Sequence, residues 1–187
     1  MIRQVEYFDQ AGAENTEKCL QVVEGLTSAY KDVVVASSSG ETGLKFAKRV
    51  GKKTNLVVVT HDFGFRQKNE SEVSPEMRQK IAEWGGKVFT GTILTSSLEK
   101  SFLTEFKGIY PAGIIAETLR RFGQGVKVCA EIVMEACDAG LIPEGKDVIA
   151  IAGTDSGSDT ICVIQSSSSR RFLDLKIKEI VAKPRNF

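Results

Sequence analysis

The chain has 187 residues, of which 42% are hydrophobic and 26% charged, which is usual for one globular domain. Its 25 basic and 24 acidic residues leave a net charge of +1, so neither nucleic acid nor an anionic membrane is expected as a partner. Early acidic residues argue against a signal peptide, and no apolar run is long enough to span a membrane. We expect a soluble, cytoplasmic, single-domain protein over residues 1–187.

Cysteine and histidine usage limits the possible chemistry. The four cysteines lie in apolar segments without a Cys-x-x-Cys pair, which is typical of buried thiols in a reducing compartment. His61 is the only histidine, so a multi-histidine metal centre is impossible. Asp155 and Asp159 are potential Mg²⁺ ligands, but two carboxylates alone do not define a site, and no metal is predicted.

The first half of the chain alternates between helices and buried strands. Asn15 is the expected N-cap of the first helix, and Ser74 with Pro75 begins the third. Repeated strand, helix, strand units predict right-handed crossovers and a parallel sheet. The expected elements are a helix at 16–30, a strand at 33–36, a helix ending at 50, a strand at 56–60, a helix at 75–84 and a strand at 87–90.

The second half departs from this alternation. Pro111 begins a helical pattern that reaches Ala139, with a bend expected at 123–125. Only seven residues separate the strands expected at 147–152 and 160–165, too few for a parallel crossover, so these strands should be antiparallel. An edge strand is expected at 174–181. The predicted fold class is α/β, with a mostly parallel sheet and antiparallel strands at one edge.

The order of the strands predicts where a ligand binds. In an open α/β sheet, ligands lie beyond the carboxyl ends of the strands, where the strand order reverses. If strands 56–60 and 87–90 extend outward from strand 33–36, then strand 147–152 must pair on its other side. The loops 37–43 and 153–159 would then meet. Both are rich in Ser, Thr, Gly and acidic residues, so a binding crevice is expected between them.

The loop that follows strand 33–36 has the composition of a phosphate site. Glycine allows close approach of an anion, the amides lie at a helix N-terminus, and the hydroxyls add donors. Each hydrogen bond to a charged oxygen contributes roughly 1.5–3 kcal/mol, so no lysine is needed. Glu41 either points outward or binds a ligand hydroxyl, and helix capping by the hydroxyls is the alternative function. The candidate residues are Ser37, Ser38, Ser39, Gly40, Glu41 and Thr42.

Two further loops border the expected crevice. Residues 153–159 suit a polyol or ribose chain, because their side chains both donate and accept hydrogen bonds, although a solvated turn has the same composition. His61 is a candidate acid or base, or else a structural histidine bonded to the loop backbone. The loop 61–74 is long enough for a lid. No Walker motif or dinucleotide fingerprint is present.

The segment 33–60, with its Ser-x-Ser-Gly-x-Thr loop, resembles the C-terminal domain of pyruvate kinases. In that domain the equivalent loop holds the phosphate of an allosteric sugar bisphosphate, and often carries a basic residue where Glu41 stands here. The resemblance implies a three-layer α/β/α sandwich whose last sheet strand is antiparallel. The catalytic barrel of pyruvate kinase has no counterpart in this sequence, so pyruvate kinase activity is not implied.

A closer resemblance, to stand-alone pyruvate-kinase-C-terminal-like proteins of archaea and some bacteria, covers almost the whole chain. The matching stretches are 12–16, 35–42, 59–61, 64–66, 116–120, 124–125, 127–129, 138–143, 148–151 and 153–154. This family implies a bound FMN without an established reaction, with the phosphate at residues 37–42. The residues implied along the ribityl chain and ring are Thr60, His61, Gly64, Phe65, Arg66, Gly153, Thr154 and, where the sequence departs from the family pattern, Asp155.

Three functions are compatible with these residues. The first is an FMN-binding flavoprotein, with a flavin-dependent oxidoreductase of unknown substrate as its enzymatic form, in which Arg66 and Lys127 are candidate donors to the ring. The others are a phosphosugar-binding isomerase-like enzyme, for which Glu41 or His61 would be the base, and an allosteric sensor module. The apolar residues of 92–109 suit either a homo-oligomer contact or a small core of their own.

Overall fold

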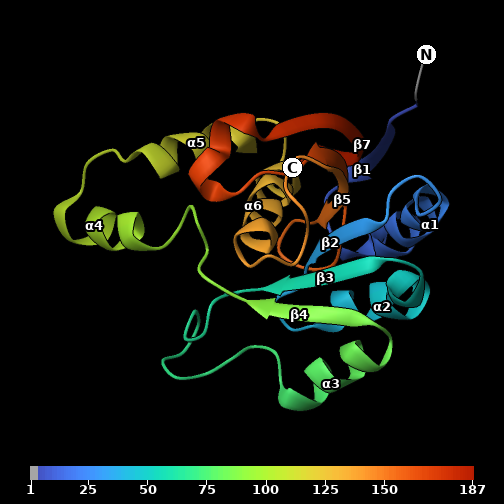
Figure 1. The fold of residues 1–187 in the computed structure, drawn as a ribbon. Coiled ribbons are helices and arrows are strands. Elements are labelled where there is room, and N and C mark those ends of the chain that lie inside the picture. Colours follow the sequence, from blue (N-terminus) through green and yellow to red (C-terminus); the bar gives the residue numbers. More distant parts are fainter. Residues whose placement is uncertain (1–3) are drawn as a thin grey trace.

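Runs of Val and Ile form the inner strands of one seven-stranded sheet, as their β-propensity and burial on both faces favour. The structure is a computed structural model that describes residues 4–187. Helices cover both faces of the sheet (Figure 1). The strands are β1 (Glu6–Gln10), β2 (Asp32–Ala36), β3 (Asn55–Thr60), β4 (Gly86–Thr90), β5 (Asp147–Ala152), β6 (Thr160–Gln165) and β7 (Lys176–Asn186). The α-helices are α1 (Thr16–Leu26), α2 (Glu41–Val50), α3 (Pro75–Glu83), α4 (Leu98–Phe106), α5 (Pro111–Arg120) and α6 (Gln124–Asp138).

The strand order is β1-β7-β6-β5-β2-β3-β4. β3 and β4 lie on one side of β2, and the later strand β5 lies on the other side, so the strand order reverses between β2 and β5. β2 pairs in parallel with β3 on one side and with β5 on the other. β5 and β6 pair antiparallel, as the short connection between them requires. These pairings confirm the expected α/β/α sandwich, in which a mostly parallel sheet has antiparallel strands toward one edge.

The edge strand expected at 174–181 is wrong in position and in extent. The strand is β7, which reaches Asn186 and lies inside the sheet, because β1 pairs in parallel with its outer side. β1 escapes sequence analysis because only Phe8 of its five residues is buried, so it shows no apolar run. Its short length suits an edge strand.

Two apolar layers enclose the sheet, because successive side chains of a strand point to opposite faces. Val33, Val35 and Val58 pack beneath α1, α2 and α3. Val34 and Val57 pack beneath α6 on the other face. All four cysteines are free thiols, and three of them are fully buried in these layers.

The helix termini differ in part from those expected. Ser74 caps α3 by accepting a hydrogen bond from the Met77 amide, as predicted. Asn15 precedes α1 but does not cap it, because its side-chain amide instead donates to the carbonyls of Gln10 and Gly12. The long helix expected from Pro111 is two helices, α5 and α6, separated at Gly123, whose φ of 127° lies outside the helical region.

The stretch 92–109, for which the sequence predicted no single helix or strand, contains α4. This helix stands away from the rest of the structure (Figure 1). None of its residues is buried, so it does not form a small core of its own. Phe102, Phe106 and Ile109 are 50%, 69% and 84% exposed. The subunit contact predicted for this stretch stays a prediction. No helix within residues 4–187 has the length and apolar character needed to cross a membrane.

We predict that Gly43→Ala destabilises the protein, because the added Cβ would lie 2.4 Å from Cγ1 of Val58 on the sheet below α2. Overpacking of this kind costs about 1–3 kcal/mol. Gly25→Ala is the matched control, because nothing lies within 4 Å of its Cβ position in α1, and it should gain roughly 0.5–1 kcal/mol from helix propensity. Urea unfolding measures both, and equal shifts of the same sign would contradict the close contact.

Candidate functional site

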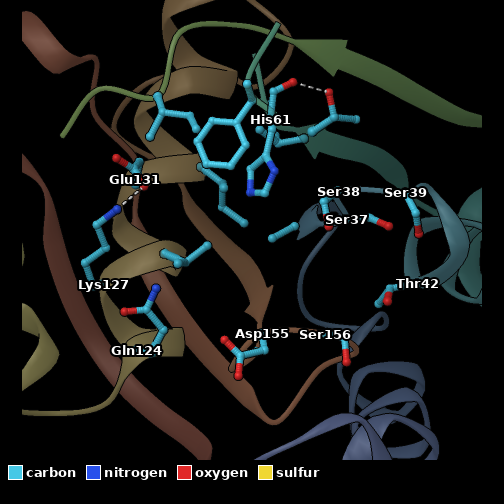
Figure 2. A pocket seen from close by; sticks show the side chains of 18 of the residues that line it. Ser37, Ser38, Ser39, Thr42, His61, Gln124, Lys127, Glu131, Asp155 and Ser156 are labelled. Carbon is cyan, nitrogen blue, oxygen red and sulfur yellow. Dashed lines mark hydrogen bonds and ion pairs between the residues drawn. The ribbon is translucent and has the colours of Figure 1, made fainter. Parts of the chain in front are cut away.

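A cavity of about 400 Å³ lies at the carboxyl ends of β2, β3 and β5. This volume is within the range of small-molecule sites. The structure brings together the two loops that were expected to meet at the strand reversal. Figure 2 shows Ser37, Ser38, Ser39 and Thr42 along one side of the cavity, with Lys127 and Glu131 of α6 opposite them and His61 above.

Two hydroxyls of the Ser37–Thr42 loop cap the start of α2. Ser37 Oγ accepts a hydrogen bond from the Gly43 amide at 3.0 Å, and Ser39 Oγ accepts one from the Glu41 amide at 3.4 Å. The first four amides of a helix have no acceptor inside it, and Leu44 is the first residue of α2 to find one. The amides of Gly40 and Thr42 therefore stay without a cap from these hydroxyls.

Other polar groups of this loop are free of protein partners. Thr42 is 9% exposed, and neither its hydroxyl nor that of Ser38 has a recorded hydrogen bond within residues 4–187. Glu41 is exposed in the first turn of α2, and its side chain lies at the rim of the cavity. Both hydroxyls and the α2 amides are thus available to an anion. Gly40 has a φ of 88° and packs against Met77 of α3, so it shapes the loop without lining the cavity.

The loop between β5 and β6 is held by a buried carboxylate. Asp159 is fully buried, and its Oδ2 accepts the amides of Gly12 and Thr154, each at 3.1 Å. Its Oδ1 accepts the hydroxyl of Thr160 at 2.7 Å. Asp159 is therefore structural and does not contribute to a Mg²⁺ site with the exposed Asp155. No group of three or more acidic, His or Cys side chains in residues 4–187 is arranged to hold a metal ion.

The loop also rests on the segment that precedes α1. Gly157 has a φ of 70°, and a Cβ there would lie 2.5 Å from Cα of Ala13. Thr16 Oγ1 accepts the Ser158 amide at 3.0 Å. The stretch 12–16 thus supports the turn at 153–157 that borders the cavity, a role that the sequence did not predict.

His61 lies at the end of β3 within a small polar cluster. Its Nδ1 is 2.6 Å from Oε2 of Glu72, whose Oε1 accepts Arg66 Nε at 2.8 Å. The ring of Phe65 lies over that of His61, with 4.1 Å between centroids. Glu72 thus orients the imidazole and leaves Nε2 as the nitrogen without this partner. The alternative prediction, that His61 is bonded to the backbone of its loop, is wrong, because its Nδ1 partner is the Glu72 side chain.

A polar stripe on α6 forms the wall opposite the serines, and most of it was missed in the sequence. Gln124, Lys127, Glu131 and Glu135 follow each other at helical spacing and all line the cavity. Lys127 Nζ makes an ion pair with Glu131 Oε2, and the two side chains are only 5% and 6% exposed. The pattern that could have indicated this wall is the repeat of polar and charged residues every three or four positions within an otherwise apolar helix.

Burial affects the acidity of this wall. Glu135 is 4% exposed. Desolvation, and next the charge of Glu131, raises the pKa of the Glu135 carboxyl to about 8. The Leu94 amide and the Lys127 ammonium act in the opposite direction but do not cancel the burial. Glu135 therefore holds its proton at pH 7.

Most of the residues proposed from the sequence lie around this one cavity. Those that line it are Ser37, Ser38, Ser39, Glu41, Thr42, Thr60, His61, Phe65, Arg66, Gly153 and Asp155. Gly40, Gly64 and Thr154 do not line it. The Gly64 amide closes a turn with the Glu70 carbonyl, and Thr154 contributes its amide to Asp159. Ligand contacts by any of these residues stay a prediction.

The fold and the cavity define a doubly wound α/β domain with a helix N-terminus at the cavity, where the strand order reverses. The family described as pyruvate kinase, alpha/beta domain, matches residues 19–164. The chain belongs to that family. The match covers β2 to β6, the strands that carry the cavity, and confirms the resemblance to the kinase domain.

We predict that Asp159→Asn lowers the free energy of unfolding by about 1–3 kcal/mol, because an amide cannot accept all three of the hydrogen bonds at a buried position. Urea unfolding measures the change. Asp155→Asn, in the same loop, is the control: Asp155 is exposed, and Asn tolerates its φ of 62°, so the change should stay within about 0.5 kcal/mol. A neutral Asp159→Asn would show that the carboxylate does not hold the loop.

Proposed function

We propose that the cavity binds a phosphorylated small molecule, FMN, with its phosphate at the N-terminus of α2. The observation that supports this most strongly is the set of polar groups at that terminus without protein partners: the hydroxyls of Ser38 and Thr42 and the uncapped α2 amides. An anion at a helix N-terminus also gains from the helix dipole. The resemblance of the sequence to the stand-alone pyruvate-kinase-C-terminal-like proteins, which implies a bound FMN, adds to this proposal.

The rest of the cavity suits the other parts of FMN. The imidazole of His61 and the polar side chains of Asp155 and Ser156 offer donors and acceptors for a ribityl chain. Apolar atoms of Phe65 and Ile132 offer contact to a flat ring. These residues therefore fit the group.

When bound, FMN would supply the redox chemistry of a flavin-dependent oxidoreductase. The residues of this chain would bind and orient it. Lys127 is the better of the two donors suggested for the ring, because it is buried in the cavity wall, whereas the Arg66 side chain is 72% exposed and bonded to Glu72. The free thiols support the expected reducing, cytoplasmic location, which is part of the same proposal.

A phosphosugar enzyme is the second candidate, and the buried carboxylates of α6 favour it. Isomerisation of a sugar phosphate needs an acid or base close to the carbons that react. Glu131 and Glu135 both line the cavity, and Figure 2 shows Glu131 on the side opposite the serine loop. Thermal-shift measurements with sugar phosphates separate the two candidates, because a sugar enzyme would be stabilised by them and not by FMN.

We predict that Thr42→Val and Ser38→Ala each weaken FMN binding on the order of ten- to a hundredfold, because each removes one hydroxyl donor to a charged phosphate oxygen. Titration of FMN into the protein, followed by quenching of flavin fluorescence, measures the affinity. Thr104→Val on the exposed face of α4 is the control and should bind FMN as the unmodified protein does.

Two results would count against the proposal. Protein that purifies colourless and does not quench added FMN would exclude flavin binding. Unchanged affinity in Thr42→Val and in Ser38→Ala, alongside normal FMN binding, would place the phosphate elsewhere.

A further inference from the structure

The α6 wall of the cavity contains two buried carboxyl groups with very different surroundings. Glu131 and Glu135 are each 4% exposed. Glu131 pairs with Lys127 through Oε2, and its Oε1 accepts the amide and hydroxyl of Thr95 at 2.8 and 2.5 Å. Both carboxylate oxygens of Glu131 therefore have donors within the protein.

Glu135, one helical turn further along α6, has no equivalent support. Its recorded donor is a backbone amide, that of Leu94, and none of the ion pairs found in residues 4–187 includes it. The charged groups near it are Lys127 and Glu131 on α6 and Asp62 in the loop after β3. Asp62 Oδ1 is itself buried and has no hydrogen-bond partner in the described chain. Two carboxylates and one already paired ammonium thus surround Glu135, and an additional negative charge there is disfavoured.

Glu135 also faces the space that a ligand would fill. It lines the same cavity as the serine loop, and this loop and the α6 wall lie on opposite sides of it (Figure 2). A molecule with its phosphate at α2 would extend its other end toward α6. A buried, protonated carboxyl group at that end offers an O–H donor that no neighbouring protein group is recorded as accepting.

We propose that Glu135 is a ligand-binding acid of this cavity and that its carboxyl O–H donates a hydrogen bond to a carbonyl oxygen or ring nitrogen of the bound molecule. This inference rests on the proposed function, which turns that end of the ligand toward α6. The ligand class it selects is a phosphorylated compound with a carbonyl group or a nitrogen heterocycle at the end remote from the phosphate.

The proton stays on Glu135 when the ligand binds, so no bond breaks and no further reactant is needed. The O–H group of Glu135 donates, and a lone pair of the ligand oxygen or nitrogen accepts. An ionised Glu135 has no proton to donate, so this contact requires the protonated carboxyl group.

The first experiment uses ligand-free protein. Infrared difference spectra between the unmodified protein and Glu135→Gln should show the C=O stretch of a protonated carboxyl group at pH 7, which is lost with a midpoint near pH 8. Glu105→Gln, on the exposed face of α4, should show no such band. NMR titration of ¹³C-labelled glutamate carboxyls in the unmodified protein gives the same answer without a variant. An ionised Glu135 at pH 7 would overturn the inference.

The second experiment measures FMN affinity between pH 6 and 10. For the unmodified protein we expect constant affinity below about pH 8 and then a loss of about tenfold for each pH unit, because binding requires the protonated carboxyl group. Glu135→Gln keeps a donor but cannot titrate, so its affinity should lose this pH dependence. The same slope in both proteins would overturn the role of Glu135 in ligand binding.

The two experiments separate the possible failures. Absence of FMN binding at every pH would overturn the proposed function, and the ligand class inferred from it, even if the infrared band shows a protonated Glu135. Normal FMN binding by a protein whose Glu135 is ionised at pH 7 would overturn the present inference and leave the proposed function standing.

Discussion

Parallel pairing of β2 with β5 is the constraint on which the cavity depends. The register Val33 to Ile149 and Val35 to Ile151 aligns the carboxyl ends of the two strands. The chain leaves β2 for α2 on one face of the sheet and leaves β5 for a tight turn to β6. Since α6 covers the opposite face, the start of α2 and the polar stripe of α6 border the same space from both sides of the sheet.

Close contacts through glycine hold both helices in place near this space. A Cβ at Gly43 of α2 would lie 2.4 Å from Val58, and one at Gly125 of α6 would lie 2.1 Å from Thr160 Oγ1. Both glycines are in the first turn of their helix. The helix termini are therefore fixed against β3 and β6 at the points where the cavity is built. The neighbour of Thr160, Asp159, connects this arrangement to the turn at 153–157 and to the segment before α1.

The inner fold could be predicted from sequence because its strands are buried on both faces and its crossovers are short. The runs at 33–36, 56–60 and 147–152 carry that information locally. β1 could not be predicted, because a single buried residue gives no pattern. Its partner β7 is also distant in the sequence: the paired residues Glu6 and Ala182 are 176 positions apart. The role of Asn15 could not be predicted for a similar reason. Its side-chain amide donates to the carbonyls of Gln10 and Gly12, and the turn that brings these carbonyls close exists only in the folded chain.

The part of the candidate site that local sequence patterns encode was predicted, and the part that tertiary structure creates was not. The serine loop follows its strand directly, so composition and position together indicated it. The α6 wall was harder to recognise, because Lys127 and Glu131 look like ordinary charged helix residues until tertiary structure buries them as an ion pair. Likewise, no feature of the local sequence around Glu135 predicts its raised pKa, which comes from burial and from the nearby charges of Glu131 and Asp62.

The charges that line the cavity explain why the proton on Glu135 matters for an anionic ligand. Besides Glu135, the lining includes three acidic side chains, Glu41, Glu131 and Asp155, and three basic ones, Arg66, Arg120 and Lys127, so their formal charges cancel. An ionised Glu135 would tip this balance toward negative charge and oppose a phosphate held only by hydroxyls and amides. A neutral Glu135 removes that opposition. If the proposed ligand binds, its anion at α2 and the proton on Glu135 would favour each other, because each would lessen the electrostatic cost of the other.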